Sequence, residues 1–136
     1  MTHIGIDTGV NTGFAVWDSS RKKFIDLETL AIHQAMEKVL MWKDIVGKDN
    51  LVVSFEDARQ RKWFTGGKEK QQGAGSIKRD SSIWEDFLKD KGITFRMVAP
   101  KDNMTKMDAA PFKAVTGWQG RTSYHARDAA MLVFGR

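Results

Sequence analysis

The sequence predicts an α/β protein in which helices cover a mixed β-sheet. Two observations carry this prediction: three strand-like segments come first, and helical and strand-like segments then alternate along the chain. The length of 136 residues suits one compact domain and leaves little room for a second. We therefore expect a single domain over residues 1–136, and the 41% of residues that are hydrophobic suffice for an ordinary core.

Three strands are expected before residue 33. The segment HIGID is short and apolar and ends in an acid, and Gly9 and Gly13 are expected to bracket the turn that leads into FAVWD. Residues 3–18 thus have the pattern of a β-hairpin. The third strand is expected in KFIDLETLAI.

The remaining segments alternate between the two periodicities. QAMEKVLMWKDIV has helical spacing of its apolar residues, whereas LVVSFED and ITFRMVA have the composition of buried strands. Shorter helices are expected around SIWEDFL, in APFKAVT and in the C-terminal segment YHARDAAML. The helices are expected to begin or end at residues of the capping types: Gly47, Ser81 or Ser82, Gly92, Asp108, Gly117, and Thr122 or Ser123.

Positive charge is concentrated in one stretch. The chain carries a net charge of +5, which indicates an anionic partner. Residues 59–79 alone contribute +6, so the rest of the chain sums to −1. The stretch is rich in glycine and lacks strong periodicity, so it is interpreted as a long substrate-binding loop, although a solvated or disordered surface would have the same composition.

Two aromatic residues, Trp63 and Phe64, stand among the basic residues of this stretch. Aromatic side chains in such a setting suit stacking on unpaired bases or wedging at a branch point. The candidate DNA contacts in the stretch are Arg59, Arg61, Lys62, Trp63, Phe64, Lys68, Lys70, Lys78 and Arg79.

Several classes of protein are excluded or disfavoured by what the sequence lacks. Without cysteine there can be no disulfide, thiolate nucleophile or cysteine-ligated metal. No apolar run approaches the length that spans a membrane, and the start MTHIGIDTG has no signal-peptide pattern. We expect a cytoplasmic protein that does not contact membranes.

Three acids occupy positions that favour a metal site. Asp7 and Glu56 end predicted strands, and Asp128 lies on the last predicted helix, where His125 shares its face. Taken alone, Asp7 could cap the turn before Gly9, and Glu56 could be an ordinary polar strand end. Together, carboxylates repel one another unless a cation compensates them, and they suit Mg²⁺ or Mn²⁺. A pair of such ions can stabilise both the attacking and the leaving oxygens of a phosphodiester.

The motifs resemble those of RuvC-type Holliday-junction resolvases, which belong to the RNase H-like nuclease superfamily. IGIDTGVNTGFAVWD is similar to their opening hairpin, VVSFEDARQR to their second acidic motif, and HARDAAMLV to their C-terminal acidic helix. The resemblance spans nearly the whole chain in the same order and is nearest to small phage-type members. It implies an RNase H-like mixed five-stranded sheet and an endonuclease that leaves 5′-phosphate and 3′-hydroxyl ends.

The resemblance also implies the site and the partners. Asp7, Glu56 and Asp128 would hold two Mg²⁺ ions, for which Mn²⁺ would substitute, and His125 stands where relatives place an acid or a histidine. The substrate would be branched DNA, most simply a four-way junction, cut by a homodimer in the cytoplasm of a bacterium or of a phage-infected cell. Phosphate contacts would come from Lys101, Lys106 and Lys113, with Arg121 as a further candidate; a role in surface solubility would explain these residues as well.

Three assignments stay open at the level of sequence. His125 could ligate a metal or act as a general base, and it is counted at the site in either case. Adjacent strand residues face opposite sides, so one of Glu56 and Asp57 should face the site; Glu56 matches the motif, and Asp57 is expected to form a salt bridge or a loop cap. The stripe of Ile83, Trp84, Phe87 and Leu88 could be core packing or a dimer contact.

Other functions share parts of this pattern. A nucleic-acid-binding relative without catalysis would keep the fold, and a flap, fork or RNA-processing nuclease would keep the site as well. The segment GIDTGVNTG also resembles the phosphate-binding hairpin of sugar kinases and actin-like proteins, which normally need two such domains. Intact acids argue against the first alternative, and the length of the chain argues against the last.

Overall fold

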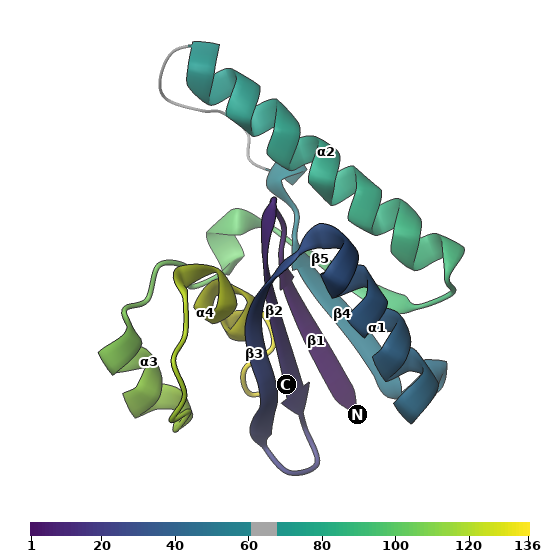
Figure 1. Ribbon diagram of the computed structural model, residues 1–136, viewed down its shortest axis with the longest axis vertical. Coiled ribbons are helices and arrows are strands. Elements are labelled where there is room, and N and C mark those ends of the chain that lie inside the picture. Colours follow the sequence, from purple (N-terminus) through teal and green to yellow (C-terminus); the bar gives the residue numbers. More distant parts are fainter. Residues whose placement is uncertain (61–67) are drawn as a thin grey trace.

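A mixed five-stranded sheet forms the centre of the molecule (Figure 1). The computed structural model describes residues 1–60 and 68–136, with the side chains of 68–74 and 77 left out. The strand order is β3-β2-β1-β4-β5, in which β1, β2 and β3 are antiparallel neighbours and β1, β4 and β5 are parallel neighbours. This arrangement confirms the predicted fold class. The strands are β1 (Thr2–Asp7), β2 (Asn11–Asp18), β3 (Lys23–Ala31), β4 (Leu51–Glu56) and β5 (Thr94–Val98).

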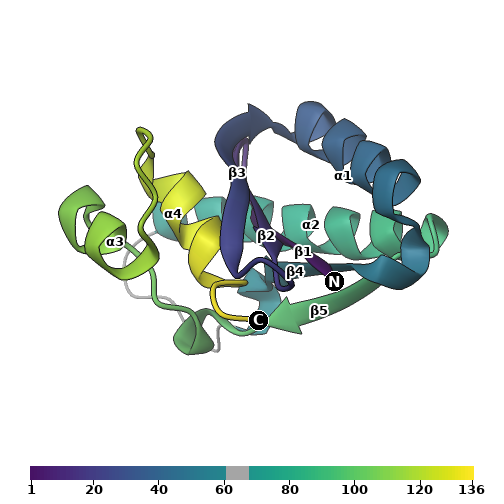
Figure 2. The ribbon, with the colours of Figure 1, turned by 90° about the horizontal axis from the view of Figure 1, so that it is seen from below.

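Helices cover both faces of the sheet (Figure 2). Alternate residues of β2 point to opposite faces: Phe14 and Val16 belong to the core shared with α1 and α2, whereas Ala15 and Trp17 belong to the core under α3 and α4. The helices are α1 (Ile32–Val46), α2 (Lys68–Asp90), α3 (Ala109–Thr116) and α4 (Tyr124–Met131), with short 3₁₀ turns η1 (Lys48–Asn50), η2 (Ala58–Gln60) and η3 (Pro100–Asp102).

The expected ends of the short helices are largely correct. Ser123 caps α4 by accepting a hydrogen bond from the Ala126 backbone N–H at 3.0 Å, and Gly117 ends α3 in the left-handed conformation. Asp108 precedes α3 without capping it through its side chain; its Oδ1 accepts a hydrogen bond from the Tyr124 hydroxyl. Gly13, expected in the hairpin turn, lies inside β2.

The prediction of a loop over residues 59–79 is wrong from Lys68 onward, because α2 begins there and not at Ser81 or Ser82. The segment KEKQQ consists of residues with high helix propensity, which needs no apolar periodicity to favour a helix. Ser81 is buried in the middle of the helix, where its Oγ accepts a hydrogen bond from the Ala58 backbone N–H at 3.3 Å.

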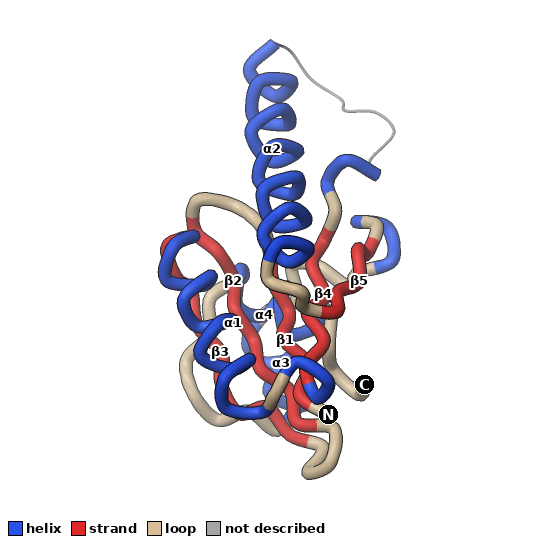
Figure 3. Tube along the Cα trace, turned by 90° about the vertical axis from the view of Figure 1, so that its right-hand side faces the viewer, coloured by secondary structure: helices blue, strands red, loops and turns tan. Residues whose placement is uncertain are grey.

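The C-terminal half of α2 is packed against the core. Trp84 and Leu88 are fully buried and Phe87 packs against them, which confirms the core-packing interpretation of that stripe; Ile83 is exposed. The other half projects past the strands as an arm, as Figures 1 and 3 show from two directions. A helix of 23 residues is roughly 34 Å long, so the arm reaches well beyond the sheet.

In the part of the chain that the structure describes, no helix combines the length and the apolar character that crossing a bilayer requires.

Candidate active site

Two acids meet at one edge of the sheet because their strands run side by side. β1 and β4 are parallel, and Ile6 is paired with Phe55. The next residues, Asp7 and Glu56, end these two strands and therefore emerge at the same edge. This placement follows from the register alone.

Helix α4 brings the other two residues to this edge by lying directly on the sheet backbone. A Cβ atom built on Gly13 would lie 1.9 Å from the His125 carbonyl oxygen, and one built on Gly5 would lie 2.1 Å from the Ala129 carbonyl oxygen. Neither distance leaves room for any side chain. The two glycines thus permit a close approach of helix and strands that places His125 and Asp128 beside the end of β1.

His125 and Asp7 are in direct contact, 118 residues apart in sequence. His125 Nδ1 lies 2.9 Å from Asp7 Oδ2, in a hydrogen bond whose direction depends on the tautomer of the ring. Burial, the largest cause, raises the pKa of Asp7 to about 6; the hydrogen bond with His125 opposes this rise, and the negative charges of Asp128 and Glu56 add to it. The charges of both other carboxylates therefore influence the pKa of Asp7.

Asn103 links the remaining two acids, and the sequence analysis missed it. Its Nδ2 donates to Glu56 Oε2 at 3.4 Å and to the Asp128 carbonyl oxygen at 3.3 Å. Its Oδ1 is buried and has no hydrogen-bond partner in the described structure. The only sequence signal was the position of Asn103 after a strand and Pro100, which does not distinguish it from any other loop residue.

The Asp128 carboxylate is held from the same loop. Asp128 Oδ1 accepts a hydrogen bond from the Lys106 backbone N–H at 2.7 Å, and Lys106 has a left-handed φ of 59°. A non-glycine residue in this conformation is uncommon and needs support from its surroundings. Residues 103–106 therefore hold the backbone and one oxygen of Asp128 in place.

In the described residues, no group of three or more histidine and acidic side chains is gathered closely enough to hold a metal ion as it stands. The chemistry of the four groups nevertheless suits one. Three carboxylates and an imidazole are ligands for Mg²⁺ and Mn²⁺. Burial first, and then the charges of Asp128 and Glu56, raise the pKa of Asp7, and a bound cation would offset both effects. The buried Asn103 Oδ1 is an unsatisfied acceptor beside two of the acids.

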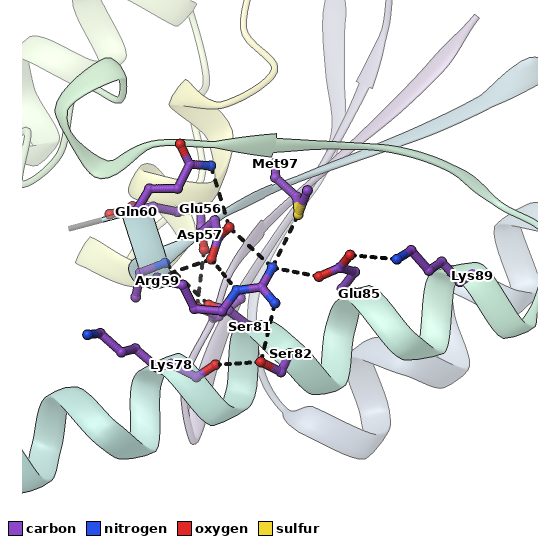
Figure 4. A network of polar contacts seen from close by, with 12 residues as sticks. Glu56, Asp57, Arg59, Gln60, Lys78, Ser81, Ser82, Glu85, Lys89 and Met97 are labelled. Atoms are coloured by element: carbon purple, nitrogen blue, oxygen red, sulfur yellow. Dashed lines mark hydrogen bonds and ion pairs between the residues drawn. The ribbon is translucent and has the colours of Figure 1, made fainter. Parts of the chain in front are cut away.

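Asp57, the residue after Glu56, forms the expected salt bridge, and its partner is Arg59 (Figure 4). Its buried carboxylate accepts from Arg59 Nε at 2.7 Å, and Arg59 Nη2 contacts Glu85 Oε1 of α2 at 2.7 Å. Glu85 in turn pairs with Lys89. Arg59 thus joins the end of β4 to α2 through ion pairs while its side chain stays partly exposed, and its contact with DNA stays a prediction.

The other candidate DNA contacts fall into three groups. Arg61, Lys62, Trp63 and Phe64 lie outside the described residues, and Lys68 and Lys70 lie on α2 with side chains that are not described. Lys78 and Arg79 follow on the same helix. On the other side of the site the candidates are all exposed: Lys101, Lys106, Lys113 and Arg121.

An open pocket of about 400 Å³ lies beside the acids, lined by Lys106, Tyr124, His125 and Asp128. It joins the loop after β5 to the start of α4. Of its lining residues, His125 and Asp128 belong to the predicted catalytic set and Lys106 is a predicted phosphate contact, whereas Tyr124 was not predicted to take part.

Comparison with known proteins finds a similar solved structure but no match by sequence. No protein-family model matches the chain, and no curated protein matches it. Among solved structures, Thermus thermophilus RuvC in complex with a Holliday junction substrate is similar, with a TM-score of 0.62 and 13% sequence identity. The match covers 99% of this chain and 92% of that one. The chain therefore has a RuvC-like fold.

Proposed function

We propose that this chain is a metal-dependent endonuclease that cleaves branched DNA, with the four-way junction as its principal substrate. One observation carries the proposal: Asp7, Glu56, His125 and Asp128 come from three separate elements and converge at one sheet edge. The similar fold of a RuvC protein bound to a Holliday junction supports the choice of substrate.

Asp7, Glu56 and Asp128 would hold two Mg²⁺ ions, or Mn²⁺ in their place, and His125 is a candidate ligand. When bound, the ions would neutralise charge on the phosphate and acidify the attacking water. The protein contributes position: β1 and β4 fix two carboxylates by their register, and the glycine contacts fix α4 with the third.

His125 has a second possible role in this site. Because Nδ1 is engaged by Asp7, the ring is oriented, and Nε2 is left without a partner in the described structure. An oriented imidazole beside a carboxylate is suited to accept the proton of the attacking water. The contact with Asp7 orients the ring for either role.

Recognition of the substrate would rest mainly on phosphate contacts. Lys101, Lys106 and Arg121 are exposed, Lys106 lines the pocket beside the acids, and the sequence of α2 contains further basic residues. Such contacts read backbone geometry and not base sequence. A four-way junction has approximate two-fold symmetry, so paired incisions call for two active sites and hence a homodimer.

The test is cleavage of a labelled four-way junction with Mg²⁺ or Mn²⁺, compared with EDTA, for wild type, Asp7→Asn and Asp90→Asn. Asp90 is exposed and distant, so its variant should cleave normally. Asp7→Asn should bind the junction and cleave it at least about 100-fold more slowly. Wild type that binds but leaves the junction intact with either metal would contradict the proposal and indicate a binding protein.

A panel of junction, flap, plain duplex and RNA–DNA hybrid substrates separates the related nucleases. The proposal expects the junction to be cut fastest, in symmetric pairs of incisions. Faster cleavage of a flap or hybrid would support the nuclease activity and contradict the four-way junction as the principal substrate.

A further inference from the structure

Tyr124 stands at the edge of the candidate active site. It is the first residue of α4, directly precedes His125, and lines the 400 Å³ pocket together with Lys106, His125 and Asp128. About half of its surface, 51%, is exposed to solvent. No step of the proposed cleavage uses this side chain.

Although the Tyr124 side chain is half exposed, both its hydroxyl and its ring have a partner. Its hydroxyl donates to Asp108 Oδ1, and the Arg127 guanidinium lies over the ring, 4.5 Å from its centroid. Arg127 is itself only 5% exposed. The Tyr124 ring is therefore held on one face by a buried guanidinium, and its hydroxyl is hydrogen-bonded to the exposed Asp108.

The support beneath the ring is well fixed because Arg127 is buried and makes three hydrogen bonds, two to backbone carbonyls and one to a hydroxyl. Its Nε donates to the Met107 carbonyl oxygen at 2.6 Å, and its Nη1 donates to the carbonyl oxygen and the hydroxyl of Thr122 at 2.8 and 2.7 Å. Since a buried guanidinium covers one face of the ring, the exposed half belongs to the opposite face and edge. An aromatic face is thus presented to solvent beside the pocket in a fixed orientation.

A fixed, exposed aromatic face is a stacking platform, because binding to it requires little further loss of side-chain freedom. The neighbouring exposed Lys106 adds a positive charge suited to a phosphate. The ligand with both features is a flat, uncharged heterocycle attached to a phosphodiester. We propose that this pocket binds an unpaired nucleobase next to the phosphate to be cleaved, stacked on Tyr124; this rests on the proposed function.

The chain offers a clean probe of this contact, because Tyr124 is its single tyrosine. Incorporation of 3-fluorotyrosine gives one fluorine NMR signal, which can be followed in wild-type protein on a junction in EDTA, without cleavage. We expect the signal to move upfield with the intact junction and to stay near its free position with a junction carrying abasic sites at the branch point. An equal shift with both DNAs, or none, would overturn the proposal.

Variants extend the test to affinity. Tyr124→Leu should bind the junction roughly 5- to 150-fold more weakly, as expected for loss of one stacked base, whereas Tyr124→Phe keeps the ring and should bind much more tightly than the leucine variant. Ile45→Ala, on the exposed surface of α1, is the matched control. Equal binding by Tyr124→Leu and wild type would reject the subsite.

If Tyr124→Leu fails to fold, the NMR comparison of intact and abasic junctions still tests the subsite, because it uses the unsubstituted chain. The outcome is also separate from that of the proposed function. If the fluorine signal shifts but no DNA is cut, the base-binding subsite is supported and the proposed nuclease function is rejected. If DNA is cut but the signal does not shift, only the subsite is rejected.

Discussion

Gly13 in β2 and the backbone of His125 in α4 touch so closely that a Cβ atom on the glycine would lie 1.9 Å from the histidine carbonyl oxygen. The same Cβ would also lie 2.9 Å from Asp7 Cβ. One hydrogen atom in place of a side chain therefore allows the helix, the hairpin and the first acid to meet. The geometry of the candidate site depends on this contact as much as on the acids themselves.

Gly13→Ala should push α4 off the sheet, because the atom it meets is backbone and cannot rotate away. Overpacking of this kind costs about 1–3 kcal/mol or more. We expect a lower free energy of unfolding in urea and loss of junction cleavage. Gly75→Ala in α2 is the control, since nothing lies within 4 Å of its added Cβ; it should not be destabilised. Unchanged cleavage by Gly13→Ala would show that α4 tolerates displacement.

Asp7→Asn should stabilise the metal-free protein at high pH. The folded pKa of Asp7 is about 6, above the usual 3.8, so the native state binds its proton more tightly than the unfolded chain does. Stability is therefore lost as pH rises from about 4 through 6, and the ionised carboxylate costs up to ~1–3 kcal/mol above that range.

The measurement is the melting temperature in EDTA at pH 8 and pH 4. Asp7→Asn should exceed wild type at pH 8 and approach it at pH 4, while Asp90→Asn should follow wild type at both. Addition of Mg²⁺ at pH 8 should raise the melting temperature of wild type more than that of Asp7→Asn. A destabilised Asp7→Asn at pH 8 would contradict the inference that burial and neighbouring charges disfavour the ionised carboxylate.

Asn103→Ala should impair cleavage without weakening DNA binding. Loss of Nδ2 removes the hydrogen bonds to Glu56 and to the Asp128 carbonyl oxygen. Residues that orient metal ligands typically contribute 10- to 100-fold in activity or metal affinity. We expect a higher Mg²⁺ concentration for half-maximal cleavage, which a purely structural residue would not change. Asp102→Ala, exposed in the same loop, should behave as wild type.

Arg59→Ala should reduce stability and not act as a simple loss of a DNA contact. Without Arg59 the buried Asp57 carboxylate loses its ion pair, and the link to Glu85 of α2 is broken. Because Arg59 is partly exposed, a cost of about 1–3 kcal/mol is expected. Arg121→Ala, at an exposed position, should leave the melting temperature unchanged and lower the salt dependence of junction binding. The reverse pattern would return Arg59 to the DNA interface.

The elements with a strong apolar period were predictable from sequence. The hairpin, β4, α1 and the cap of α4 at Ser123 all follow from alternation, helical spacing or a capping residue. Asp7 and Glu56 were placed at strand ends because both end apolar runs, and the parallel register brings them together. Glu56 accepts a hydrogen bond from Asn103 and Asp57 pairs with Arg59, and these different partners agree with the two-residue period of a strand.

What could not be predicted depends on backbone contacts between distant segments. Gly13 has the same sequence signature in a turn as under a helix, and only the packing of α4 distinguishes the two. Asn103 acts on residues 47 and 25 positions away, with no local pattern. The first half of α2 forms without an apolar stripe, so a period-based prediction treats it as a loop.

The contact of α4 with the backbone of Gly5 and Gly13 also affects how relatives of this chain can be recognised. Where main chain rests on main chain, the surrounding hydrophobic residues are free to exchange, but a methyl group at Gly5 or Gly13 would separate helix from sheet. Distant relatives should therefore retain two glycines, eight residues apart, while their other core residues change. A search profile weighted toward that spacing, with an acid between the two glycines, should recover members that overall similarity misses.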